Sequence, residues 1–268
     1  MTQPKPIQAH SRRVKLFDLP SSFLELSILA ALVLAAAMLY SSGGHAGASA
    51  YLALFAFFSV APAIMKPTAL VMNIAVATIG SARFIRARAV PWPLLVPLCL
   101  GSMPAAYVGG AIRLGPGTYL LLLGAVLLVA SGLLWLRPRS PGTRPAPRAI
   151  WLVAIGAALG FVAGMTGIGG GIFLSPLLIL TGWQEPRTTS GAAAVFILVN
   201  SVLGLLGHLS STRLIPPEAA LLGATAIMGG LVGSWLGVHR LRPLQLRRVH
   251  AVVLLLSGAK LLVEGIRR

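Results

Sequence analysis

Two glycine-rich stretches contain the residues that are best suited to hold a ligand. The more glycine-rich one, Gly164 to Gly171, has five glycines in eight residues and lies between two apolar runs, 150–162 and 172–180. Each glycine disfavours a helix by about 1 kcal/mol relative to alanine, so we expect the helix to break here. A helix that breaks inside a bilayer must satisfy its freed backbone groups from protein, water or a ligand.

A second break of the same kind extends from Ser41 to Ser49, and its Gly44 precedes Gly167 by 123 residues. After each break we expect a new half-helix to start, near Ser49 and near Ile172. Its first N–H groups have no partner within the helix, and this end of the helix dipole is positive. Because glycine lets an oxyanion reach those groups, the two breaks predict a site for a small anion. The alternative is that the glycines only let helices pack closely.

Hydroxyl and amide side chains flank both breaks. An Asn inside an apolar span needs a polar partner, so it is expected in the bundle interior or beside a water-filled cavity. For Asn73 and Asn200, contact with a substrate and a plain interhelical hydrogen bond are both open. The candidate substrate-binding residues are Gly44, His45, Gly47, Ser49, Asn73, Thr78, Thr166, Gly167, Gly169, Gly170, Gly171, Ser175, Asn200 and Ser201.

The titratable side chains offer few candidates for a role in the site. His45 could lend positive charge to an anion, take part in proton coupling, or only cap the break at a water interface. Lys66 could attract an anion at an outer mouth, but a solvated loop lysine is the preferred interpretation. His208 lies near a span end, where it needs no special role. Lys260 and Glu264 are four residues apart and are expected to form an ion pair.

The composition is that of a membrane protein. The 268 residues are 56% hydrophobic and only 10% charged, against about 25% charged in soluble domains. The mean hydropathy is +0.86. The formal charge of +17 comes from Lys and Arg between apolar runs, a pattern typical of loops facing an anionic leaflet and not of a nucleic-acid-binding face. The single Cys99 excludes an intramolecular disulfide.

The apolar runs predict an all-α integral membrane protein with about eight transmembrane segments in two repeats of four, each repeat opening with a glycine-broken helix. The two halves align without gaps at an offset of 123 residues, which indicates an internal duplication like that of many transporters. The predicted parts are a basic cytoplasmic tail (1–21), a first repeat (22–136), an Arg/Pro-rich linker (137–149) and a second repeat (150–268).

The number of crossings decides how the repeats are related. Four crossings in each half give parallel repeats, whereas a re-entrant hairpin at each break leaves three and gives inverted repeats. The four-crossing arrangement places more of the Lys and Arg residues on the inner side, so the positive-inside rule favours it, with both termini cytoplasmic.

Several function classes lack the motifs that they need. The chain has no G-x-x-x-x-G-K-[ST] loop for an ATPase and no cluster of metal ligands. No catalytic dyad or triad is visible, so we expect neither an enzyme nor a cofactor.

Two groups of motifs resemble the TauE/SafE sulfite exporter family across residues 22–266. They are Gly167 to Gly171 with Ser175-Pro176, and Thr189 to Ala193 with Asn200-Ser201. In the first half, Gly43 to Ser49 and Lys66 to Asn73 resemble a subgroup described as membrane transporters. The first half departs from the pattern, because its glycine run is incomplete and Ala53 stands where the repeat places a proline.

This resemblance implies a multi-pass carrier of the bacterial inner membrane that exports small sulfur-containing anions such as sulfite or organosulfonates. We therefore expect a secondary transporter whose partners are a small anion and the lipid bilayer, with protons as a candidate coupling ion and no nucleic acid. Two alternatives stay open: a non-transporting scaffold subunit, and a carrier of a different small solute. The sequence predicts no oligomeric state.

Overall fold

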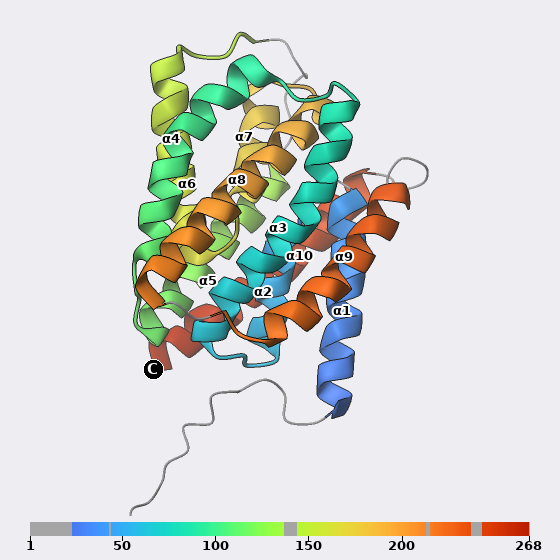
Figure 1. Ribbon diagram of the computed structural model, residues 1–268, viewed down its shortest axis with the longest axis vertical. Helices are drawn as coiled ribbons and strands as arrows, with labels where there is room; N and C mark the ends of the chain where they lie inside the picture. Colours follow the sequence, from blue (N-terminus) through green and yellow to red (C-terminus); the bar gives the residue numbers. More distant parts are fainter. Residues whose placement is uncertain (1–22, 43, 137–143, 213–214, 237–242, 268) are drawn as a thin grey trace, which may run out of the picture.

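The computed structural model describes residues 23–42, 44–136, 144–212, 215–236 and 243–267. These residues form ten helices and no strand (Figure 1). The expected tail, residues 1–21, and most of the expected linker, residues 137–143, lie outside the described ranges. The helices are α1 (Phe23–Ser42), α2 (Ala48–Phe57), α3 (Pro62–Arg86), α4 (Trp92–Ala111), α5 (Pro116–Trp135), α6 (Ala149–Thr166), α7 (Gly171–Thr181), α8 (Pro186–Thr212), α9 (Glu218–Leu236) and α10 (Pro243–Arg267).

Six of these helices are long and apolar enough to cross a membrane: α1, α3, α4, α5, α6 and α8. The chain is therefore a multi-pass helical membrane protein. The expected number of eight crossings is not confirmed, because neither α9, whose described apolar part Ala219–Gly233 is shorter, nor α10 is among these six.

The two short helices begin where the glycine breaks place them. Helix α2 follows Gly47, whose φ is 97°, and helix α7 follows Gly170, whose φ is 81°. Both angles are in the left-handed region that glycine reaches without steric cost, so the chain can turn sharply and start a new helix. The two helices start at Ala48 and Gly171, one residue before the expected positions and 123 residues apart.

Helices α3 and α8 pack against each other in the middle of the bundle and run antiparallel (Figure 1). Leu70 contacts the position of Gly204, while Gly80, ten residues further along α3, faces Ala194, ten residues earlier in α8. In the expected duplication, the 123-residue offset pairs these two helices. Equivalent helices of parallel repeats would run in the same direction, so this packing does not fit the expected parallel arrangement.

The first helix of each half packs against the fourth helix of the other half, α1 on α9 and α6 on α4. Gly156, Gly160 and Gly164 lie directly against the α4 backbone at three successive turns, where a Cβ would collide with it. For Gly164 the packing interpretation is therefore the right one, because this glycine lies inside α6 and lets two helices approach closely.

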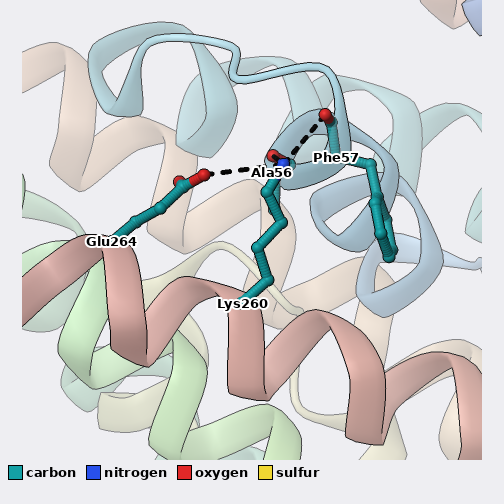
Figure 2. A network of polar contacts seen from close by, with 4 residues as sticks. All are labelled: Ala56, Phe57, Lys260 and Glu264. Carbon is teal, nitrogen blue, oxygen red and sulfur yellow. Dashed lines mark hydrogen bonds and ion pairs between the residues drawn. The ribbon is translucent and has the colours of Figure 1, made fainter.

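The expected ion pair near the chain's end is confirmed. Lys260 Nζ lies 3.5 Å from Glu264 Oε1. The same ammonium group donates to the carbonyls of Ala56 and Phe57, at 2.6 and 2.9 Å, and so joins α10 to the end of α2 (Figure 2).

Candidate functional site

The second glycine break leaves a row of backbone donors without acceptors. The Gly167 N–H still donates to the Ala163 carbonyl at 2.9 Å, and the Thr166 hydroxyl oxygen lies 3.4 Å from the Ile168 nitrogen. Beyond these, no acceptor among the described residues takes the N–H groups of Gly169, Gly170, Gly171 and Ile172. A helix N-terminus with four such donors is a ready-made anion site.

The first break has the same arrangement. The Gly44 N–H donates to the Ser41 carbonyl and that of His45 to the Tyr40 carbonyl, at 3.1 and 3.0 Å. The next four N–H groups have no acceptor within the described part of the chain, and each precedes its counterpart in the second break by 123 residues. These four donors belong to Ala46, Gly47, Ala48 and Ser49.

Asn73 and Ser201 meet at Gly169, one from each half. The Asn73 amide donates to the Ile168 carbonyl at 3.3 Å. A Cβ on Gly169 would lie 2.9 Å from both Asn73 Nδ2 and Ser201 Oγ. The Asn73 Oδ1 and Ser201 Oγ atoms are fully buried and have no hydrogen-bond partner among the described residues. Because a buried polar atom without a partner costs about 1–3 kcal/mol, these two atoms indicate that something else bonds to them.

His45 joins the first break to the second half. Its Nε2 lies 2.8 Å from the Ser175 hydroxyl, which is on α7 about one turn after Gly171. Ser49, at the start of α2, donates to the phenol oxygen of Tyr40 at 3.3 Å. The structure therefore brings the two breaks together, with His45 between them.

Three other candidates bond within their own helices. Asn200 is fully buried and donates to the Phe196 carbonyl at 2.8 Å, which leaves its Oδ1 without a partner among the described residues. The Thr166 hydroxyl donates to the Val162 carbonyl at 2.7 Å. Thr78 is exposed and donates to the Ile74 carbonyl at 2.6 Å, so it does not join the residues around Gly169. Gly44 lies against Ser190 of α8, outside that cluster.

A cavity of about 250 Å³ lies beside the second break and contains three basic side chains. It opens where α4 and α8 end and α3 and α5 begin, at the lower end of the bundle in Figure 1. Its wall includes Tyr119, whose hydroxyl donates to the Thr166 carbonyl at 2.9 Å. The basic residues that line it are Lys66, Arg113 and His208.

Lys66 is the residue whose surroundings differ most from expectation. It lies within α3 and is only 6% exposed, so it is not a solvated loop lysine. A Cβ on Gly167 would touch the Lys66 backbone, so this lysine packs directly against the second break. Lys66 is the only charged residue between Phe55 and Val76, and this is the sequence signal that could have identified it.

Comparison with known proteins gives a family and two relatives that match most of the chain. The family model described as Sulfite exporter TauE/SafE matches residues 29–261. Probable membrane transporter protein y4hK of Sinorhizobium fredii (strain NBRC 101917 / NGR234) is 33% identical over 237 residues, which cover 84% of this chain and 94% of that protein. Probable membrane transporter protein YjnA of Bacillus subtilis (strain 168) is 29% identical over 239 residues, which cover 82% and 92%. No solved structure matches.

Proposed function

The chain belongs to the sulfite exporter TauE/SafE family, and we propose that it is a secondary transporter that exports a small sulfur-containing oxyanion such as sulfite or an organosulfonate. The observation that carries this proposal is the matched pair of helix starts. Each start presents four N–H groups without an acceptor among the described residues, at positions 46–49 and 169–172.

The chemistry of these helix starts favours an anion over a neutral solute. Backbone N–H groups are donors only, and the positive end of each helix dipole points in the same direction as they do. Sulfite and sulfonate groups carry several acceptor oxygens on one small centre, so one ligand can accept bonds from several of these donors. The buried Ser201 hydroxyl, which has no partner among the described residues, supplies a further donor.

The antiparallel pair α3 and α8 suggests how transport proceeds. Asn73 lies on α3 and Ser201 on α8, so the proposed site takes one polar side chain from each half. In inverted repeats, a movement of one half against the other exposes a central site first to one side of the membrane and then to the other. The anion gradient or coupled protons would drive this movement, and His45 is the candidate proton carrier.

Two other functions remain as alternatives. A non-transporting scaffold subunit would use the glycines of α6 for packing, but it has no need for donors without acceptors at two helix starts. A carrier of an uncharged solute would leave the charge of the cavity beside Gly167 without a purpose. Both alternatives therefore explain fewer of the features of the two breaks.

A thermal-shift and flux experiment tests the proposed function. The purified protein is heated with sulfite, sulfate, methanesulfonate or dimethyl sulfone, the last being a neutral analogue of similar size. A ligand at 100 times its dissociation constant stabilises the folded state by about 2.7 kcal/mol, so a specific anion should raise the unfolding midpoint while the sulfone does not. Liposomes that contain the protein should then release the stabilising anion. Equal effects of the sulfone and the anions, or no flux of any of them, would contradict the proposal.

A further inference from the structure

We propose that the cavity lined by Lys66, Arg113 and His208 is a second anion site, which captures the oxyanion and delivers it to the second glycine break. This inference rests on the proposed function, since it assigns the route by which the same substrate class reaches the site. Its ligand is a small oxyanion with two negative charges, for which sulfite is the model.

Lys66 provides the fixed charge at the inner end of the cavity. Its Nζ donates to the carbonyls of Gly110 at 2.8 Å and Gly109 at 3.4 Å, at the end of α4. An ammonium group has three donors, so these two carbonyls leave one for a ligand in the cavity. The backbone and Cγ of Lys66 lie against Gly167, so the stem of this lysine connects the cavity to the second break.

Lys260 shows what a purely structural lysine looks like in the same protein. It also donates to two successive carbonyls at a helix end, those of Ala56 and Phe57 (Figure 2). Its charge is matched by Glu264, and its side chain is 29% exposed. Lys66 is almost completely buried, and no carboxylate among the described side chains pairs with it. A buried ammonium without a counter-ion is costly, so an anion in the cavity would stabilise it.

The three basic residues form a series from the outside inwards. Arg113 is exposed, His208 is half-buried and Lys66 is buried. The Thr212 hydroxyl donates to the His208 carbonyl at 2.7 Å, and its oxygen lies 3.1 Å from the ring Nε2 of His208. The same oxygen lies 3.2 Å from the ring Nδ1, so Thr212 packs against the edge of the imidazole in the cavity wall.

The other half lacks these cations at the corresponding positions. An offset of 123 residues relates Lys66 to Thr189, His208 to Ile85 and Arg113 to Leu236. Lys66 and Ile85 are 19 residues apart on α3, which corresponds to about 28 Å along the helix. Among the described residues, the cavity formed by Lys66, Arg113 and His208 therefore has no counterpart built from the equivalent positions of the other half.

Charge-removing variants test this site in liposomes with reconstituted protein. The variants are Lys66→Gln and Arg113→Gln, and the matched control is Lys260→Gln, which also removes a carbonyl-bonded ammonium group. We expect Lys66→Gln to raise the KM for sulfite at least 10-fold and Arg113→Gln to raise it about 3-fold. Both should raise the KM for methanesulfonate less, because this ion has a single charge. The control should change neither KM.

The outcomes separate this proposal from the proposed function. If the wild-type protein neither transports sulfite nor gains thermal stability from it, the proposed function fails. If the wild-type protein does both, but Lys66→Gln and Arg113→Gln retain its KM, only the entry site fails. If Lys66 only stabilises the end of α4, Lys66→Gln will lower the unfolding midpoint and leave the KM for sulfite unchanged, which overturns the proposal. If Lys66→Gln does not fold, the exposed Arg113 position decides, since an unchanged KM there overturns the proposal.

Discussion

The ring Nε2 of His45 lies 2.8 Å from the hydroxyl of Ser175, which places the first glycine break in contact with the helix that follows the second. The bond has no equivalent in the other direction, because the residue 123 positions after His45 is the apolar Ile168. The pair therefore joins the two halves at one point next to the proposed site. Any movement of the halves against each other must accommodate this contact.

The pair can be tested with a double-mutant cycle of His45→Ala and Ser175→Ala. Each single change should remove the same hydrogen bond, whose net value is about 0.5–1.5 kcal/mol. In detergent, the double variant should therefore lower the thermal unfolding midpoint by less than the sum of the two single changes. As a control, His45→Ala combined with Ser257→Ala should be additive, because Ser257 bonds to the Val253 carbonyl of its own helix. Additive effects in the His45–Ser175 cycle would mean that the contact contributes nothing.

Gly169→Ala should abolish anion binding and lower stability. Gly169 has a φ of 79°, and a Cβ there would lie 2.9 Å from Asn73 Nδ2 and Ser201 Oγ. The left-handed conformation alone costs a residue with a Cβ about 1–2 kcal/mol. The control is Gly132→Ala in α5, where a Cβ meets nothing within 4 Å and should stabilise the helix by up to about 1 kcal/mol. Binding measured by thermal shift in Gly169→Ala at the wild-type level would contradict the site.

The local consequences of the glycines could be predicted from the sequence. Left-handed glycines at Gly47 and Gly170 and helix starts at Ala48 and Gly171 follow from backbone chemistry within a few residues. The role of Lys66 could not be predicted in this way, because its carbonyl partners lie 43 and 44 residues away on α4. The relative direction of α3 and α8 depends on helix packing, which the distribution of basic residues does not determine.

Helical periodicity was a second signal that could have been used. Lys66 and Asn73 are seven residues apart, which places them on one face of α3, the face that meets the second break. Thr78 is five residues beyond Asn73, about 140° around the helix, so its exposed position follows from the 3.6-residue turn. Among the hydroxyls and amides near the breaks, this spacing would have selected Asn73 and rejected Thr78.

Ser201→Ala should weaken anion binding without destabilising the protein. The Ser201 hydroxyl is buried and has no partner among the described residues, so removing it breaks no hydrogen bond of the described structure. The loss of one contact to a charged ligand corresponds to about 1.5–3 kcal/mol, or roughly 10- to 150-fold in affinity. The control is Ser131→Ala, whose hydroxyl donates to the Ala251 carbonyl at 2.7 Å. It should lower the unfolding midpoint and leave the affinity unchanged. The opposite pattern would show that Ser201 is structural.

Engineered disulfides test the antiparallel packing of α3 and α8, on which an inverted arrangement of the halves depends. A Cβ on Gly80 would lie 3.6 Å from the Cβ of Ala194, and disulfides need a Cβ separation of about 3.5–4.5 Å. In a Cys99→Ser background, Gly80→Cys with Ala194→Cys should therefore cross-link under mild oxidation. A protease cut in the loop between α5 and α6 then leaves the two halves joined on a non-reducing gel.

The control pair for the cross-link is Leu70→Cys with Ala194→Cys. Leu70 precedes Gly80 by ten residues on α3, which moves the first sulfur about 15 Å along the helix, beyond the reach of a disulfide. In the structure Leu70 instead contacts the position of Gly204, ten residues after Ala194 on α8. If α3 and α8 instead ran parallel with the same four positions in contact, Leu70 would meet Ala194 and Gly80 would meet Gly204. Cross-linking of the control pair in place of Gly80→Cys and Ala194→Cys would therefore overturn the antiparallel packing, and the inverted arrangement would fall with it.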